Sequence, residues 1–156
     1  MYARIIFAMV RFAARKGLAN ASGVNSPKQQ ARQTGIRGET YAYWYLRRHG
    51  YILVARNFTF AGIKGEIDMA AYDGSTLAFV EVKTRSPSAP GSATPEEAVN
   101  WEKRRTLVRM AQAFLRARHL DASSCRFDVL AIEAGPGAPP PQRLHKKTVR
   151  AWHHAL

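Results

Sequence analysis

The chain has 156 residues, the size of one ordinary domain, and 46% of them are hydrophobic, which is enough for a sizeable core. Its formal net charge of +13 favours a polyanionic partner, with nucleic acid first and an anionic membrane surface second. A single cysteine, Cys125, excludes an intramolecular disulfide and a cysteine-based zinc site, and it fits a cytoplasmic protein. No apolar run approaches the roughly 20 residues that a membrane-spanning helix needs.

The charge is distributed unevenly along the chain. Residues 1–35 carry six basic residues and no acidic one, whereas residues 36–100 carry seven of each sign. Residues 101–156 carry eleven basic and four acidic residues. Residues 17–35 are rich in Gly, Asn, Ser and Gln and are typical of a linker. We therefore expect a basic N-terminal extension over 1–34, either flexible or a peripheral helix, and one domain over 35–156.

The expected elements of this domain alternate between helical and extended patterns. The first is a helix from Ile36 that Gly50 stops. Strands follow at 51–60, 66–72 and 76–84, then a Pro/Gly/Ser loop at 87–95, a long helix within 95–120 and a strand at 125–133. Residues 143–156 are short, basic and ambiguous. This order predicts an α/β fold, with helices covering both faces of a mixed sheet.

The two strands at 66–72 and 76–84 carry charges where apolar residues would be expected. A two-residue turn at Gly74-Ser75, of type II′, would place Asp68 opposite Glu81 and Glu66 opposite Lys83, all on one side. Like charges in direct opposition destabilise a strand pair. Either Asp68 and Glu81 share a proton, or they hold a cation. For Glu66 we favour an ordinary cross-strand ion pair with Lys83.

A cation site at these carboxylates would suit Mg²⁺ or Mn²⁺. Hard oxygen ligands favour such ions, and Mg²⁺ is often bound through one or two carboxylates while it keeps several waters. Lys83, two residues after Glu81, could orient or deprotonate a metal-bound water, or stabilise charge on a phosphate.

Four ordered segments of the chain carry a resemblance to a known family. They are "GIRGETYAYWYLRRHGYILVARN", "GEIDMAA", "FVEVKTR" and "RFDVLAI". Together they resemble the bacterial YraN-like family over residues 35–133, and Asp68 with Glu81-Val82-Lys83 resembles the PD-(D/E)xK nuclease motif. Ile67 stands where that motif has its proline. The resemblance implies a restriction-endonuclease-like, Holliday-junction-resolvase-like fold.

The resemblance also implies roles for individual residues. Asp68 and Glu81 would be metal ligands, the Val82 carbonyl a third, and Lys83 the catalytic lysine. Glu39 matches the helix glutamate of resolvase-like nucleases and would bind the metal through water. Its position near the start of a helix has an equally good explanation in the helix dipole.

The leading hypothesis from these residues is a metal-dependent nuclease that hydrolyses phosphodiester bonds, with branched DNA as one candidate substrate. DNA is favoured over RNA, and a homodimer is expected by analogy. Basic residues predicted to hold phosphates are Arg85, Lys103, Arg104 and Arg105, followed by Lys146, Lys147 and Arg150. The alternative is a nucleic-acid-binding module that keeps the fold with little or no catalysis. A third reading is a membrane-surface protein that uses the basic N-terminus.

Overall fold

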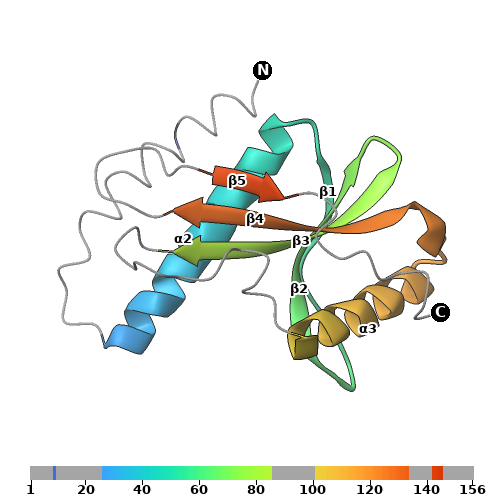
Figure 1. Ribbon diagram of the computed structural model, residues 1–156, viewed down its shortest axis with the longest axis horizontal. Coiled ribbons are helices and arrows are strands. Elements are labelled where there is room, and N and C mark those ends of the chain that lie inside the picture. Colours follow the sequence, from blue (N-terminus) through green and yellow to red (C-terminus); the bar gives the residue numbers. More distant parts are fainter. Residues whose placement is uncertain (1–8, 10–25, 86–100, 134–141, 146–156) are drawn as a thin grey trace.

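The computed structural model describes residue 9 and residues 26–85, 101–133 and 142–145 (Figure 1). Its elements in chain order are α2 (Pro27–Arg48), β1 (Ile52–Phe60), β2 (Ile63–Asp73), β3 (Thr76–Arg85), α3 (Trp101–Ala117), the 3₁₀ turn η1 (Ala122–Ser124), β4 (Cys125–Glu133) and β5 (Gln142–His145). The predicted loop at 87–95 lies outside the described residues. None of the helices in the described part of the chain is long and apolar enough to cross a membrane.

The five described strands form one mixed sheet in the order β1-β2-β3-β4-β5. Strands β1, β2 and β3 are antiparallel neighbours, β3 and β4 are parallel, and β4 and β5 are antiparallel. The crossover that makes β3 and β4 parallel contains α3, as parallel neighbours require. The predicted mixed α/β sheet is therefore confirmed.

The two helices pack on opposite faces of this sheet (Figure 1). On one face, Leu107, Met110 and Phe114 of α3 pack against Phe79 and Phe127. On the other face, buried residues of α2, namely Tyr41, Ala42 and Leu46, pack with Met69, Val80 and Leu130. Adjacent residues Phe79 and Val80 thus point to different cores, which explains why the strands are apolar on both faces.

Helix α2 begins earlier than the sequence pattern indicated. Ser26 accepts a hydrogen bond from the Gln29 backbone N–H at its N-terminus, and the Gln29 side chain accepts one from the Ser26 N–H. Pro27 occupies the first helical position, where it costs no hydrogen bond. The expected linker over 17–35 is therefore wrong for residues 27–35, because reciprocal capping starts a helix there and the Lys, Gln, Ala and Arg residues that follow favour helix.

The fifth strand was not predicted from the sequence. Gln142–His145 overlaps the segment 143–156, whose sequence was ambiguous, yet it pairs with β4 from Val129–His145 to Ile132–Gln142. Four residues are too few for a periodic pattern to stand out.

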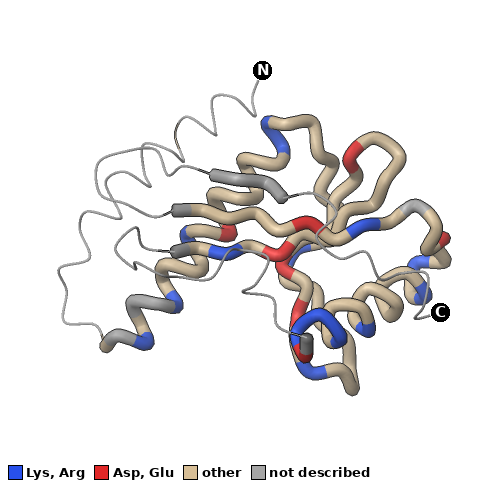
Figure 2. Tube along the Cα trace, in the orientation of Figure 1, with Lys and Arg blue, Asp and Glu red and all other residues tan. Residues whose placement is uncertain are grey.

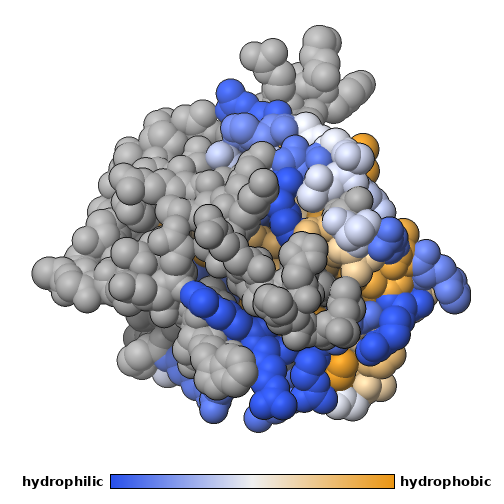
Figure 3. Space-filling model, turned by 45° about the vertical axis from the view of Figure 1, so that its right-hand side comes forward, coloured by the Kyte–Doolittle hydropathy of each residue, from blue (hydrophilic) through white to orange (hydrophobic). Residues whose placement is uncertain are grey.

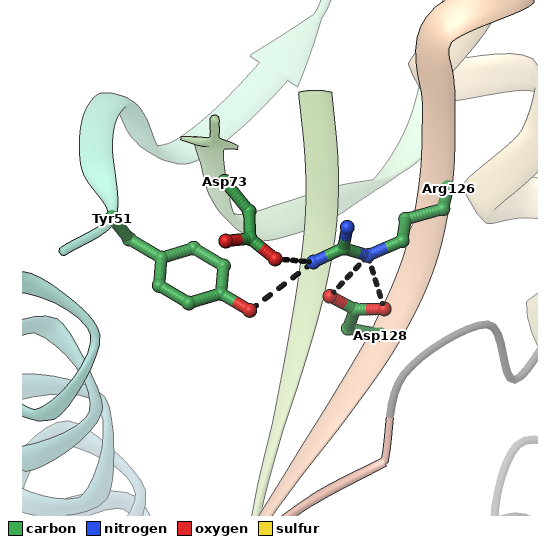
Figure 4. A network of polar contacts seen from close by, with 4 residues as sticks. All are labelled: Tyr51, Asp73, Arg126 and Asp128. Carbon is green, nitrogen blue, oxygen red and sulfur yellow. Dashed lines mark hydrogen bonds and ion pairs between the residues drawn. The ribbon is translucent and has the colours of Figure 1, made fainter. Parts of the chain in front are cut away.

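A polar network joins Tyr51, which directly precedes β1, to residues of β2 and β4 (Figure 4). Arg126 Nε donates to both oxygens of Asp128 at 3.0 and 2.9 Å. Its Nη2 donates to Asp73 Oδ2 at 2.6 Å and to the Tyr51 hydroxyl at 3.1 Å. Asp128 is only 1% exposed, so its charge needs this partner. The network fixes the end of the β2–β3 hairpin against β4.

Candidate metal and phosphodiester site

The site forms where β2 parts from β3. The predicted hairpin register is confirmed from Asp73–Thr76 to Met69–Val80, and Gly74 has the positive φ (61°) that the first position of a type II′ turn needs. The ladder stops there, so Asp68 and Glu81 are not a ladder pair. Instead, Asp68 Oδ2 accepts a hydrogen bond of 2.7 Å from the Val82 N–H. A side-chain carboxylate thus takes the place of the missing backbone acceptor.

This hydrogen bond also fixes the direction of the Val82 carbonyl. In a strand, the N–H and C=O of one residue point to the same neighbouring strand. The Val82 carbonyl therefore faces the gap beside Asp68, on the side away from β4. Its orientation is consistent with the ligand role that the resemblance implies.

Glu81 is a buried carboxylate with two lysines on one oxygen. It is 5% exposed. Its Oε1 lies 2.9 Å from Lys83 Nζ and also accepts a hydrogen bond from Lys103 Nζ. Its Oε2 is buried without a hydrogen-bond partner in the described part of the chain. A buried acceptor without a partner costs stability, so Oε2 is a candidate ligand atom for a group outside the described residues.

The environment of Asp68 favours its protonated form. Burial and the nearby charge of Glu81 raise the pKa of Asp68 from its usual 3.8 to about 7, with a smaller rise from Glu39. The Val82 N–H and Lys103 oppose this rise in the pKa. A carboxyl group perturbed in this way by burial and a like charge is typical of functional sites.

Helix α3 supplies Lys103 to the site. Gly65 in β2 has φ of 125°, and a Cβ at this position would lie 2.7 Å from Thr106 Cγ2. This close approach brings the second turn of α3 onto β2. Burial lowers the pKa of the Lys103 ammonium, but the hydrogen bond to and attraction of Glu81 outweigh that effect and raise it overall. We predicted Lys103 as a phosphate contact; the structure places it on Glu81.

Two other carboxylates stand apart from this cluster. Glu39 of α2 lies 3.9 Å from Arg56 of β1 and is near enough to Asp68 to affect its pKa. Glu66 is exposed, and the expected Glu66–Lys83 ion pair is wrong, because Lys83 pairs with Glu81 instead. The register that would have paired them ends at Met69, before the strand reaches Glu66.

The remaining basic residues lie along α3 and beyond it. Arg104 and Arg105 are exposed on this helix. Figure 2 shows a series of Lys and Arg positions along α3, and acidic positions where the central strands cross. Hydrophilic side chains gather on the lower part of the face in Figure 3. Arg85 is the last residue of β3. Lys146, Lys147 and Arg150 lie outside the described residues.

The donor set fits a magnesium-type ion only in part. Among the described residues, no group of three or more His, Cys, Asp or Glu side chains is placed to hold a metal. The site offers two carboxylates and a backbone carbonyl, and Oε2 of Glu81 lacks a partner. Such a set suits Mg²⁺, which keeps waters and completes its shell with substrate phosphates, and it does not suit a metal that needs a full protein cage.

The sequence comparisons place this chain among bacterial relatives. A protein of Symbiobacterium thermophilum named as a UPF0102 protein is 41% identical over 125 residues, which is 80% of this chain and 99% of the relative. A UPF0102 protein of Pseudomonas savastanoi pv. phaseolicola is 40% identical over 116 residues, covering 74% of this chain and 91% of the relative.

The family match covers the segments that build the site. Residues 38–132 match the family described as "Uncharacterised protein family UPF0102". They span the end of α2, the β2–β3 hairpin, α3 and most of β4. The family suggested by the sequence motifs is confirmed: this chain belongs to the UPF0102, or YraN-like, family.

Proposed function

We propose that this protein is a metal-dependent nuclease that hydrolyses phosphodiester bonds of nucleic acid in the cytoplasm. The observation that carries the proposal is the meeting of Asp68, Glu81 and Lys83 where β2 leaves β3, with Glu81 Oε2 buried and without a partner. Fold stability alone does not favour two carboxylates in such proximity.

Each residue has a distinct task in this proposal. Asp68, Glu81 and the Val82 carbonyl would hold the ion, and the Val82 N–H keeps the Asp68 carboxylate in orientation. A bound Mg²⁺ or Mn²⁺ would lower the pKa of a water and neutralise charge on the phosphate. Lys83, held 2.9 Å from Glu81, would donate a hydrogen bond to a phosphate oxygen or to the attacking water. The basic α3 would attract the substrate backbone without reading its sequence.

The proposal is tested by a cleavage assay on labelled linear duplex, single strand, flap, four-way junction and structured RNA. Wild type is compared with Asp68→Asn and Lys83→Met in Mg²⁺ and Mn²⁺. We expect cleavage that needs the metal and falls by at least about 100-fold in each variant, since Asp68→Asn removes a charged metal ligand and Lys83→Met removes the hydrogen bond to the reacting phosphate or water.

Two matched variants control for general changes in charge. Glu66→Gln and Lys64→Met alter exposed residues of the same strand β2 and should cleave as wild type. Cleavage that survives in both site variants would show that the activity comes from elsewhere or from a contaminant.

A nucleic-acid-binding module without catalysis is the second candidate. Two observations favour it: Lys103 already neutralises Glu81, and no third carboxylate completes a cluster in the described part of the chain. Tight binding of the same substrates with no cleavage of any would support this candidate against the nuclease.

A further inference from the structure

Glu81 has more positively charged neighbours than a carboxylate that only stabilises the fold would require. Two ammonium groups, from Lys83 and Lys103, contact the same oxygen, Oε1, while Oε2 has no partner in the described part of the chain. Ammonium groups close together repel each other, and an ion pair for stability would need only one. The second lysine therefore calls for a separate explanation.

The two lysines differ in how firmly the fold holds them. Lys83 lies on β3, two residues from Glu81, so the pleat keeps its side chain on the same face. Its side chain is 24% exposed. Lys103 reaches Glu81 from another element, 22 residues along the chain, and its side chain is 40% exposed. Its head can be solvated after a rotation of its long side chain, without movement of β3 or α3.

An incoming divalent cation would bring a third positive charge to this carboxylate. Lys103 is also close enough to Asp68 to lower the pKa of that carboxyl, so its charge acts on both proposed metal ligands. A cation and the Lys103 ammonium thus compete for the same negative charge. The more exposed and more weakly constrained of the two lysines is the one that would leave.

We propose that Lys103 is a built-in competitor of the divalent cation, paired with Glu81 in the metal-free protein and displaced from Glu81 when the cation binds. This inference rests on the metal site of the proposed function. Lys103 would neutralise the buried carboxylate when no ion is present and set the ion concentration at which the site fills. It is a positioning residue for Glu81, distinct from Lys83, which stays beside the reacting groups.

The test is the affinity of the full-length protein for Mn²⁺ or Mg²⁺ alone, measured by isothermal titration calorimetry without nucleic acid. The variants are Lys103→Met, which removes the charge, and Lys103→Gln, which keeps a hydrogen-bond donor for Glu81. We expect the Kd to fall by about tenfold in both, since both remove the ammonium charge that competes with the cation, and a charge-assisted contact is worth about that factor. Lys103→Arg should bind the ion about as weakly as wild type.

A matched control removes general electrostatic effects. Arg105→Met takes the same charge from an exposed site on the same helix, and it should leave the Kd within about twofold of wild type. Thermal unfolding gives a second readout. Without metal, the melting temperature of Lys103→Met should be lower than that of wild type. Saturating Mg²⁺ should reduce this difference in melting temperature.

The outcomes separate this inference from the nuclease proposal. An unchanged or higher Kd in both Lys103→Met and Lys103→Gln would overturn the competitor role, and so would the absence of binding heat in every protein. Tighter ion binding in both variants, together with no cleavage of any substrate, would support the competitor role while contradicting the nuclease.

Discussion

Asp68 is the residue whose chemistry depends most on its surroundings. On an isolated strand its carboxyl would titrate at its usual pKa, but burial and Glu81 raise the pKa of Asp68 to about 7. The folded, metal-free protein therefore binds more protons than the unfolded chain between about pH 4 and pH 7. In this window the contribution of Asp68 to the free energy of unfolding falls as the pH rises.

The prediction at the residue scale concerns this pH dependence. Asp68→Asn mimics the protonated carboxyl and does not titrate. The free energy of unfolding of this variant, relative to that of wild type, should therefore increase as the pH rises from 5 to 8. The gain should not exceed about 1.4 kcal/mol for each pH unit. Urea denaturation at several pH values, with EDTA present, measures it. Parallel pH profiles of the two proteins would show that Asp68 titrates normally.

At the scale of elements, glycines decide how closely the helices approach the site. Gly38 in α2 packs directly on β3, where a Cβ would overlap Thr84 Oγ1 and lie 3.0 Å from Thr84 Cβ. The contact places Glu39, the next residue, on the side of the site opposite α3. Gly65 allows the matching approach of α3 to β2 through Thr106.

The prediction at this scale is that Gly38→Ala destabilises the protein by about 1–3 kcal/mol, because the added methyl overpacks the contact with Thr84. The free energy of unfolding in urea measures this effect. Gly35→Ala is a matched control in the same helix: nothing lies within 4 Å of its Cβ, and it should stabilise by up to about 1 kcal/mol. Equal effects of the two substitutions would contradict close packing at Gly38.

At the scale of the whole molecule, the net charge of +13 governs encounters with other molecules. The exposed arginines of α3 lie on the same helix as Lys103, so a polyanion attracted to them is brought toward the carboxylates. In such an arrangement, binding is dominated by phosphate contacts and depends on salt more than on sequence.

The prediction at this scale concerns salt. Binding of a DNA duplex in EDTA should weaken steeply from 50 to 200 mM KCl. In the double variant Arg105→Ala/Arg109→Ala, the slope of log K against log salt should be about two units shallower. Fluorescence anisotropy with duplexes of unrelated sequence measures both. A slope identical to that of wild type would show that Arg105 and Arg109 do not contact phosphate.

Local patterns in the sequence determined much of this protein. Apolar runs on both sides of Gly74-Ser75 predicted the β2–β3 hairpin, and the two-residue turn predicted its register from Asp73–Thr76 to Met69–Val80. Charged residues inside these strands marked Asp68, Glu81 and Lys83 as a group. The start of α2 and the short strand β5 were not predicted, since a cap and a four-residue pairing leave weak local signals.

Only the tertiary structure decided which charges meet. The elements around the hairpin set the point where β2 parts from β3. The sequence therefore does not indicate that the Val82 N–H bonds to the Asp68 side chain and not to a backbone carbonyl of β2. Arg126 and Asp128 lie two residues apart on one strand, but the other partners of Arg126, Asp73 and Tyr51, come from distant parts of the chain. Lys103 likewise reaches Glu81 only after α3 packs on β2. Contacts between distant segments depend on packing geometry, which local periodicity does not encode.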